Sequence, residues 1–353
     1  MRPDPSAVRV GVLGCGRIAQ MFHLPVLRGL PGVRLVVAAD IDPQARAAVS
    51  RLVPGVALAD DTAAVLDDPE VEAVVIALPT HLHAEVAVAA FAAGKHVYVE
   101  KPLGVDLSEG LRVQRAWTSA GLVGAVGFNF RFHPLHQIAA DSVARHQLGE
   151  VVALRAVFSS APRDLPEWKR QRVTGGGALL DLASHHVDMA RHILGVEVDT
   201  VSASIVSRHH PLDTAALTLT MASGVIAHLM ATSSAAASDR LEVFGTEATL
   251  EVDRMGRRQV SLAPTAGRTG VGAATEALVQ GLRSTVDRIY PPAETTFKDA
   301  LGTFVTAIRT GRYEGPTIED GVRAGAILEA AERSAGSGRV ESVSALPGGP
   351  ASG

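Results

Sequence analysis

A row of acidic and histidine side chains in one segment is the first feature that suggests chemistry. Residues 175–195, GGGALLDLASHHVDMARHILG, carry apolar side chains at helical spacing. Their polar members step by four, three and four residues and so share one face of the expected helix: Asp181, His185, Asp188 and His192. The adjacent His186 points about 100° away from this stripe, so replacing it with alanine is expected to cost little activity.

Three kinds of site carry such a stripe: an acid–base pair, a metal site, or a buried hydrogen-bond network. A metal is disfavoured, because one helix supplies at most two or three ligands and no cysteine is available in the segment. Acid–base chemistry and a satisfied buried network both stay open on these residues alone.

A second candidate is the Glu-Lys-Pro triplet in VYVEKPLGV, residues 97–105. An apolar, β-branched run ends there on Glu100 and Lys101, followed by Pro102. One interpretation is a solvated turn, because proline favours an extended preceding residue and charges face water. The other is that the turn directs the Lys101 ammonium at a ligand.

A third candidate is the glycine-rich turn at residues 14–19, GCGRIA, which fits the G-x-G-x-x-G/A fingerprint of dinucleotide-binding proteins. It follows an apolar strand and opens a helix. In that position Gly14 and Gly16 let the backbone approach a pyrophosphate, and Arg17 and Ile18 begin the helix whose N-terminus attracts it. The alternative is an ordinary tight turn. Cys15 needs no redox role.

Asp40 closes the second strand, VVAAD, about 20 residues after the fingerprint. A carboxylate at this position accepts hydrogen bonds from both ribose hydroxyls and repels a 2′-phosphate, which favours NAD over NADP. Ile41 offers no cation to hold a phosphate. The alternative is that an aspartate here caps the next helix, but Asp42, before Pro43, suits that role better.

These residues are positioned by two different kinds of fold. The first third of the chain alternates short, continuously apolar strands with helix-length segments, which predicts a doubly wound parallel sheet covered on both faces. Beyond it, closely spaced strand candidates with short turns predict an antiparallel sheet. We expect an α/β chain with a nucleotide-binding domain at 1–126, an α+β substrate-binding and oligomerisation domain at 127–343, and a tail at 344–353.

Composition narrows the partners. The 353 residues are 47% hydrophobic and 20% charged, with a net charge of −4. No basic surface for nucleic acid and no membrane-binding segment are expected, so small molecules are favoured. A single cysteine and no secretory leader favour the cytoplasm. The strand GVIAHLMA is apolar on both faces, which predicts that a partner subunit covers one of them, as in a homodimer or homotetramer.

Taken together, these motifs resemble the Gfo/Idh/MocA family of NAD(P)-dependent oxidoreductases, which includes glucose–fructose oxidoreductase and inositol 2-dehydrogenase. The resemblance rests on the fingerprint and Asp40, then LPTHLHAEVAVAAFAAGKHVYVEKP, GFNFRFHP and the helix at 175–195, in this order. It extends to TIEDGVRAGAILEAAERSAGSGRV near the end. It implies an N-terminal Rossmann domain and a C-terminal α+β domain with a large open, mainly antiparallel sheet.

The resemblance also implies roles for the catalytic candidates. The lysine of the Glu-Lys-Pro motif corresponds to Lys101, which would stabilise the alkoxide formed as hydride leaves. His185 would be the general base toward the substrate hydroxyl, with Asp181 orienting or polarising the site. Glu100 would help bind the cofactor or hold Lys101.

Further positions follow from the same resemblance. Pro79, Thr80 and His83 would line the nicotinamide ribose, although Thr80 could equally be a helix cap. Substrate contacts are implied for Asn129, Arg131 and Trp168, with core packing as the alternative for Trp168. Two departures from the family pattern are Ala183 in place of glycine and Phe130 within Asn129-Phe130-Arg131; Phe130 leaves the substrate class open.

The function implied by the resemblance is hydride transfer between NAD and a secondary alcohol or ketone of a sugar, cyclitol or nucleotide-linked sugar. No metal is expected. A second class is a glycoside hydrolase that oxidises its substrate transiently with bound NAD, which net formation of NADH would exclude. A third is a non-catalytic nucleotide sensor, against which Lys101, Asp181 and His185 together argue.

Overall fold

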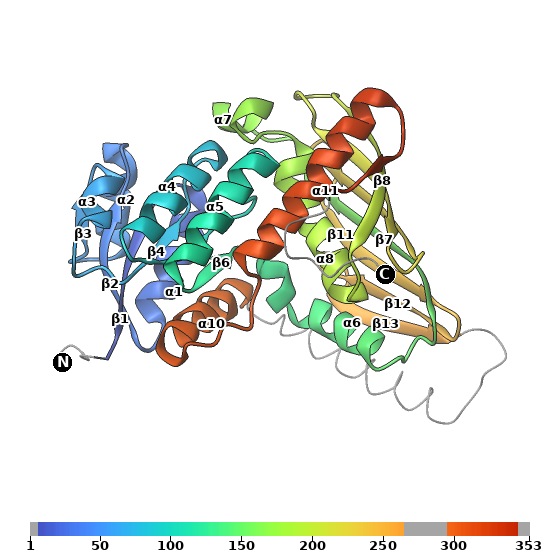
Figure 1. Cartoon of the computed structure of the whole chain (residues 1–353), viewed down its shortest axis with the longest axis horizontal. Coiled ribbons are helices and arrows are strands. Elements are labelled where there is room, and N and C mark those ends of the chain that lie inside the picture. The colour runs from blue at the N-terminus through green and yellow to red at the C-terminus, as the bar shows by residue number, and fades with distance from the viewer. Residues whose placement is uncertain (1–5, 265–294, 345–353) are drawn as a thin grey trace. The chain divides into compact units, whose positions relative to one another are not determined.

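The computed structural model describes residues 6–264 and 295–344 (Figure 1). They form two compact units. The first contains the described residues up to Asn129 together with Val173–Gly175 and Thr295–Gly325. The second contains Phe130–Arg172, the described part of Gly176–Glu294, and the chain from Ala326 onward. The predicted tail lies outside the described residues from 345 onward.

A six-stranded parallel sheet is the centre of the first unit. Its strands are β1 (Val8–Leu13), β2 (Val33–Ala39), β3 (Ala57–Ala59), β4 (Ala73–Ile76), β5 (His96–Val99) and β6 (Gly124–Val126). Their order is β3-β2-β1-β4-β5-β6, the doubly wound dinucleotide-binding topology. Strand β4 is buried throughout, as expected of a strand covered on both faces. The predicted Rossmann domain is confirmed.

Helices of the first unit follow the strands as the sequence predicts. They are η1 (Ala19–His23), α1 (Leu24–Gly29), α2 (Pro43–Leu52), α3 (Thr62–Leu66), α4 (Thr80–Ala92), α5 (Leu107–Ala120) and α10 (Thr296–Thr310). The Asp42 side chain accepts the backbone N–H of Gln44 and caps α2, with Pro43 at its first turn. The cap predicted at Asp42 is therefore confirmed. Gly121 ends α5 in the left-handed conformation.

Helix α10 groups with the first unit although it follows residue 127 by a long way. It contacts α1, β1 and β5. The reason is aromatic packing, since Phe304 lies edge-on to Tyr98 of β5, and Phe297 stacks on Phe22 of η1. A linear reading of the chain places helix α10 in the second domain, because its aromatic partners Tyr98 and Phe22 are far from it in the sequence.

The second unit is built on an eight-stranded sheet. Its strands are β7 (Val151–Ser159), β8 (Val198–Val206), β9 (Thr214–Met221), β10 (Ile226–Thr232), β11 (Ser238–Gly245), β12 (Ala248–Asp253), β13 (Gln259–Pro264) and β14 (Glu341–Ser342). The order is β13-β12-β11-β7-β10-β9-β8-β14, and only β7 and β10 pair in parallel. The predicted large, mainly antiparallel sheet is confirmed.

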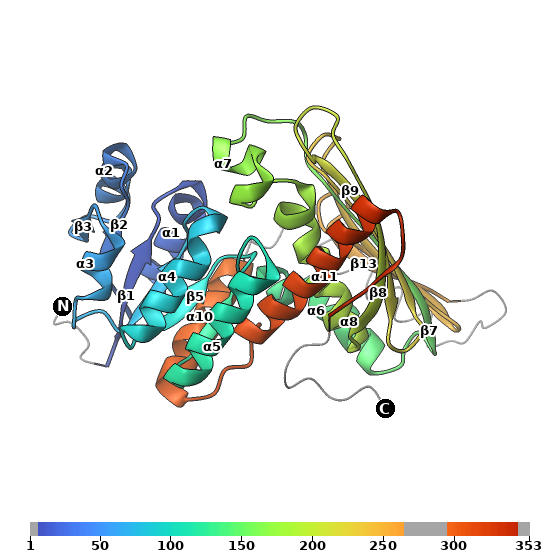
Figure 2. The same ribbon diagram turned by 45° about the horizontal axis from the view of Figure 1, so that its top comes forward.

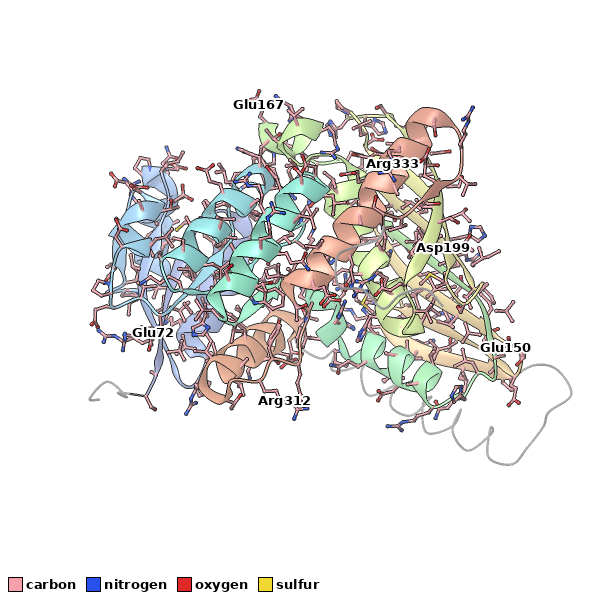
Figure 3. The ribbon with its side chains drawn as sticks, viewed as in Figure 1. Glu72, Glu150, Glu167, Asp199, Arg312 and Arg333 are labelled. Carbon is pink, nitrogen blue, oxygen red and sulfur yellow. The ribbon has the colours of Figure 1, made fainter. Side chains whose placement is uncertain are left out.

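Helical segments of the second unit lie on one face of this sheet (Figure 2). They are α6 (Pro134–Ala144), η4 (Leu179–Ala183), α8 (Ser184–Leu194) and the part of α11 (Ile318–Ser337) from Ala326 onward. The short helix α7 (Glu167–Arg170) belongs to the same unit but stands away from the sheet, and the chain passes from one unit to the other at η2 (Asn129–Phe132) and η3 (Arg172–Thr174). Among the described residues no helix covers the other face (Figure 2). Charged side chains such as Glu150, Asp199 and Arg333 are exposed on this unit (Figure 3).

Strand β10 alternates as the sequence predicts. Ala227 and Leu229 are buried under the helices, whereas Ile226 and Met230 are 42% and 40% exposed on the other face. The uncovered face therefore carries the second set of apolar side chains of this strand.

Candidate active site

The fingerprint turn has two glycines with different requirements. Gly14 has φ of 93°, and a Cβ there would lie 2.5 Å from the carbonyl oxygen of Ala77, so the turn packs directly on the end of β4. A Cβ at Gly16 would meet no atom within 4 Å. The first glycine lets the chain pack and the second leaves space open at the start of a helix that begins with Arg17 and Ile18.

Asp40 lies directly against this turn. Its Oδ2 accepts the backbone N–H of Cys15 at 2.7 Å, and its Oδ1 accepts the N–H of Asp42 at 2.8 Å. A carboxylate accepts about four hydrogen bonds, so these two leave capacity for a ribose diol. Burial, reinforced by the charge of Asp40, raises the pKa of Cys15 to about 12, which leaves that thiol inert at neutral pH.

One cation near this carboxylate was not anticipated. Arg46, on α2, donates to the carbonyl oxygens of Asp40 and Ile41 at 2.6 and 3.1 Å. Its guanidinium is thus fixed on the backbone at the end of β2. Ile41 follows Asp40 directly in the sequence, whereas Arg46 reaches the same backbone from the first turn of α2.

The residues of the Glu-Lys-Pro motif follow β5 at the same carboxyl edge of the sheet. Glu100 is buried, and its Oε1 accepts from Nε2 of His23 at 2.9 Å. Burial alone would raise the pKa of Glu100, but the His23 hydrogen bond and the charges of His23, Lys101 and His83 outweigh it and lower the pKa. Lys101 is half-buried beside an ionised carboxylate, and its peptide bond to Pro102 is cis.

His83 lies behind this turn. Its Nδ1 is 2.8 Å from the carbonyl oxygen of Pro102, and its Nε2 is 2.8 Å from that of Leu78. Burial lowers the pKa of His83 although both backbone contacts favour protonation. The ring therefore joins the Glu-Lys-Pro turn to the loop after β4, and its predicted contact with the cofactor stays a prediction.

The loop after β4 carries two more predicted positions. Pro79 precedes α4 as its N-cap residue and Thr80 is the first residue of the helix, with no side-chain capping bond. The alternative that Thr80 caps the helix is therefore wrong, because a cap must precede the first helical residue. Thr80 is buried and would meet a Cβ at Gly175 at 2.4 Å.

In the second unit, Asp181 and His185 lie one turn apart where the π-helical segment η4 runs into α8. Asp181 is held by Lys169, whose Nζ lies 2.8 and 2.9 Å from its two carboxylate oxygens. Lys169 also lies over the ring of Trp168, 5.2 Å from its centroid. Trp168 thus packs on the lysine that holds a predicted catalytic carboxylate.

His185 is fixed by aromatic packing. Its ring stacks on Phe130, with centroids 4.1 Å apart and planes at 13°. Phe130 also contacts the Arg254 guanidinium, which lies 3.9 Å from the centroid of the phenylalanine ring. Offset aromatic stacking contributes about 0.5–1.5 kcal/mol beyond burial. Phe130, the departure from the family pattern, therefore packs against the predicted base and limits its rotation.

The rest of the polar stripe has a different role. Asp188 is buried and accepts from Nε and Nη2 of Arg131 at 2.8 and 2.5 Å. Arg131 and Asp188 thus form a bidentate ion pair, which for Asp188 corresponds to the buried hydrogen-bond network considered above. The predicted contact of Arg131 with the substrate stays a prediction. Asn129, in the first unit, is buried and donates to Oγ1 of Thr296 at 3.2 Å.

The predicted difference in activity between His185 and His186 stays a prediction. His186 is buried, its ring lies beside Phe130 and Phe158 as the His185 ring does, and its Nε2 lies 3.2 Å from Oδ1 of Asp239. Arg254 donates to the other oxygen of Asp239 at 2.7 Å. Replacing His186 with alanine therefore leaves a buried carboxylate short of a partner, so the change costs stability even where it spares the chemistry.

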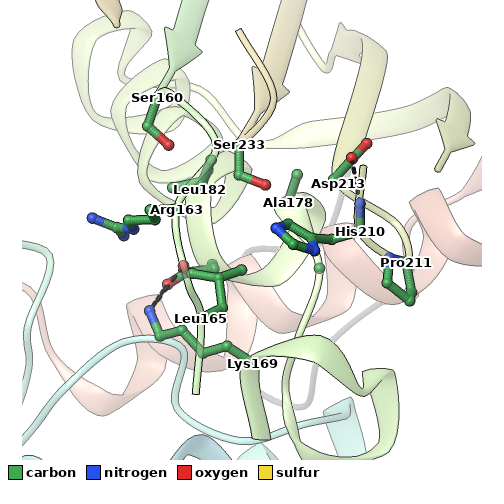
Figure 4. A pocket seen from close by; sticks show the side chains of 12 residues that line it. Ser160, Arg163, Leu165, Lys169, Ala178, Leu182, His210, Pro211, Asp213 and Ser233 are labelled. Atoms are coloured by element: carbon green, nitrogen blue, oxygen red, sulfur yellow. Dashed lines mark hydrogen bonds and ion pairs between the residues drawn. The ribbon is translucent and has the colours of Figure 1, made fainter. Parts of the chain in front are cut away.

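A hollow beside Asp181 lies entirely within the second unit (Figure 4). Its enclosed space is about 20 Å³, room for about one or two water molecules. Lys169, Ser160, Ser233 and His210 lie around it (Figure 4).

In the described parts of the chain, no three His, Cys, Asp or Glu side chains are grouped as metal ligands. No described helix is long and apolar enough to cross a membrane.

The residues present in the first unit fit NAD. The space at Gly16 would be filled by a side chain at that position, and a carboxylate with remaining acceptor capacity lies beside it at Asp40. Lys101 follows β5, which is separated from β1 by β4, at the same carboxyl edge of the sheet, the edge at which ligands bind in such folds.

Comparison with known proteins gives the same division of the chain. Residues 8–128 match the family model described as the oxidoreductase family with an NAD-binding Rossmann fold. Residues 136–251 match the model described as the GFO/IDH/MocA C-terminal domain. The first match spans the whole first sheet, and the second spans β7 to β11 and most of β12 of the second sheet.

Three named proteins are similar to the chain. A dTDP-3,4-didehydro-2,6-dideoxy-alpha-D-glucose 3-reductase from Streptomyces violaceoruber is 31% identical over 92% of this chain and 93% of its own length. The scyllo-inositol 2-dehydrogenase (NAD(+)) of Bacillus subtilis is 26% identical over 89% of each. Levoglucosan dehydrogenase from Pseudarthrobacter phenanthrenivorans is 33% identical over 56% of this chain and 53% of its own length, about half.

A solved structure supports the fold comparison. Levoglucosan dehydrogenase in complex with NADH and levoglucosan superimposes with a TM-score of 0.82, at 25% identity, over 96% of this chain and 100% of that one.

Three contacts of the site were not foreseen from the sequence: His23 with Glu100, Lys169 with Asp181, and Phe130 with His185. His23 is wholly buried, and its position in the first helix after the fingerprint was the only available signal. A histidine among apolar residues at the start of a nucleotide-binding helix reads first as core packing.

Proposed function

We propose that the substrate of this protein is a secondary alcohol or ketone of a sugar, a cyclitol or a nucleotide-linked sugar. The chain belongs to the Gfo/Idh/MocA family and is an NAD-dependent dehydrogenase or reductase. The named relatives act on one example of each class. The observation that carries the proposal is the shared edge of the first sheet, where open space at Gly16, the Asp40 carboxylate and Lys101 follow three strands.

NAD supplies a hydride acceptor when bound. Gly16 and the helix N-terminus would receive its pyrophosphate, and Asp40 would accept the adenosine ribose hydroxyls. The remaining work falls to this chain's own side chains, beginning with removal of the hydroxyl proton.

In the proposed mechanism His185 accepts the proton of the substrate hydroxyl, and the stacked Phe130 keeps its ring in place. Lys101 stabilises the negative charge that develops on that oxygen as hydride leaves the carbon. The products are the ketone, the reduced cofactor and a proton on His185. The ionised Glu100 keeps its negative charge beside Lys101 and so favours the ammonium form.

The outer face of the second sheet supports an assembly proposal as well. Ile226 and Met230 of β10 are exposed there, and no described helix covers them. A second copy of the chain is the proposed cover, giving a homodimer or homotetramer.

The experiment is a screen of polyols, aldoses and nucleotide sugars with NAD, followed by absorbance of the reduced cofactor. Net NADH formation with at least one of them supports the proposal. Cleavage of a glycoside without net NADH would support redox-assisted hydrolysis instead and contradict it. The matched control is the His185→Ala protein, which should bind NAD and form little NADH.

A further inference from the structure

Arg254, the residue that follows β12, is anchored to the start of β11. Its backbone N–H donates to the carbonyl oxygen of Asp239 at 3.0 Å, and its Nε donates to Oδ2 of the same residue at 2.7 Å. Its Nη2 lies 2.6 Å from that oxygen as well. The Arg254 side chain is 12% exposed and that of Asp239 1%. The guanidinium is therefore held in one place by a buried partner.

The anchor at Asp239 is ionised. Burial alone would raise the pKa of Asp239, but the hydrogen bond of His186 and the charge of Arg254 outweigh it and lower the pKa. Hydrogen bonds between a guanidinium and a carboxylate are stronger than those between neutral groups. Arg254 is thus fixed to the sheet by the stronger kind of contact.

Phe130 lies between this guanidinium and the predicted base, within the same unit of the fold. The His185 ring covers one face of Phe130, at a centroid distance of 4.1 Å and an interplanar angle of 13°. The Cζ of Arg254 lies 3.9 Å from the same centroid. Non-bonded heavy atoms keep about 3.5–4.0 Å apart, so one face of a single ring has no room for both groups. Arg254 and His185 therefore lie on opposite faces of Phe130.

Other aromatic rings also contact Phe130. Phe158 meets it edge-on at a centroid distance of 5.7 Å, and His136 is tilted against it at 5.7 Å. Phe158 lies edge-on to His185 too, at 6.1 Å. The His185 ring is thus packed between aromatic groups, and Arg254 supports the largest of these contacts from its far side.

Phe130 and Arg254 both lie outside the parts of the chain that match the family models. Phe130 falls between the matched ranges, 8–128 and 136–251, and Arg254 follows the second. Phe130 is also a position at which the chain departs from the family pattern. The contact between them is therefore a property of this chain that its motifs do not show.

We infer that Arg254 is a positioning residue for the reaction: anchored by Asp239, it supports the Phe130 ring and so keeps the His185 imidazole in the orientation that accepts the substrate proton. The inference rests on the proposed function, in which His185 is the general base. A guanidinium suits this task because it is planar and stacks on an aromatic face, whereas a lysine ammonium is a compact point charge.

The test measures turnover of the complete protein with NAD and the best substrate of the screen. The variants are Arg254→Met, Arg254→Lys, Phe130→Leu and the double variant that combines Arg254→Met with Phe130→Leu. The matched control is Arg240→Met. Arg240 lies on β11, its Nη2 is 3.4 Å from Oδ2 of the buried Asp253, and it contacts no aromatic ring in the described part of the chain. The control therefore also removes a cation from a buried aspartate of this sheet.

Arg254→Met should lower kcat by about 3- to 10-fold with little change in KM, as expected when a cation–π contact behind the base is lost. Arg254→Lys should recover part of the loss, because it keeps the charge and lacks the flat group. The double variant should be no slower than Phe130→Leu, since both changes act through the same ring. Arg240→Met should leave kcat unchanged even where it lowers the melting temperature.

A spectroscopic readout reports the position of the base independently of turnover. Histidine labelled with ¹³C at Cε1 gives one signal for each ring, and the His185→Ala protein identifies that of His185 among the 13 histidines. Stacking on Phe130 displaces this proton signal upfield. Arg254→Met should move it toward its position in Phe130→Leu, with Arg254→Lys between the two and Arg240→Met at the wild-type position.

Three results would overturn the inference. The first is a wild-type kcat and a wild-type His185 signal in Arg254→Met. The second is a double variant slower than Phe130→Leu by the full factor that Arg254→Met shows alone, because Arg254 would then act independently of Phe130. The third is an equal loss of kcat in Arg240→Met, which would trace the effect to the loss of an ion pair.

Two further cases are decided by the same measurements. If Arg254→Met does not fold, Arg254→Lys replaces it, and a wild-type kcat and signal in that variant would overturn the inference. If no compound of the screen yields NADH while the His185 signal responds to Arg254 and Phe130 as expected, the proposed function fails and the positioning of His185 by Arg254 is supported.

Discussion

His136 gives the sharpest stability prediction. This histidine on α6 is 1% exposed, and its Nδ1 lies 3.1 Å from the Phe130 carbonyl oxygen. Burial, the largest cause, lowers the pKa of His136 from 6.5 to about 3, so the folded protein keeps the ring neutral and Nδ1 donates to Phe130. The unfolded chain binds a proton near pH 6.5, and the folded chain does not until about pH 3.

The sign and size follow from proton linkage. Above pH 6.5 both states are neutral and the group contributes no pH dependence. Below it the unfolded state binds more protons, so the free energy of unfolding falls as the pH is lowered, by about 1.4 kcal/mol for each pH unit until about pH 3. Between pH 6.5 and 5 His136 alone should cost about 2 kcal/mol.

The perturbation is His136→Asn, which keeps a side-chain N–H for Phe130 and cannot titrate. Denaturant unfolding at pH 8 and pH 5 gives the change in free energy for each protein. The wild type should lose about 2 kcal/mol more than the variant. His83 and His96, whose pKa values burial also lowers, are present in both proteins and cancel. Equal pH dependence in the two proteins would refute this reasoning.

Other predictions concern the cofactor, the base and assembly. Wild type should bind NADH more tightly than NADPH, and Asp40→Ser should reduce that preference in a binding titration; equal affinities in the wild type would contradict this. His185→Ala should lower kcat by about 10²- to 10⁴-fold, roughly 3–5 kcal/mol, and should keep the affinity for NAD, whereas His186→Ala should mainly lower the melting temperature. A large loss of kcat in His186→Ala with little loss in His185→Ala would show that His185 is not the base. Phe130→Leu should lower kcat several-fold by freeing His185, and an unchanged kcat would remove its positioning role. Light scattering should show a dimer or tetramer, and a monomer at micromolar concentration would contradict the proposed partner copy.

Local patterns made much of the fold predictable. Continuous apolar strands, the glycine turn and the Asp42 cap act within a few residues, so the order of elements in the first sheet follows from the sequence. The alternation of β10 is local in the same way. A linear reading of the chain groups helix α10 with the second domain, because its aromatic partners Tyr98 and Phe22 lie 206 and 275 residues earlier in the chain.

The candidate site was predictable in its residues and not in their contacts. Helix periodicity places Asp181 and His185 together, yet it does not show that Lys169 holds one and Phe130 packs on the other. Asp188 shares the same stripe, but an arginine 57 positions away turns it into a buried ion pair. Such pairs depend on tertiary packing, which periodicity does not encode.

The central claim is hydride transfer from a polyol to NAD at a site completed by Lys101. The most direct measurement is the rate of NADH formation by wild type and Lys101→Met, each saturated with NAD and with the best polyol of the screen. We predict that both proteins bind NAD with similar affinity and that Lys101→Met is slower by at least about 10²-fold, since the variant lacks the positive charge that stabilises the developing alkoxide. Equal rates in the two proteins, or polyol conversion by the wild type without net NADH, would contradict it.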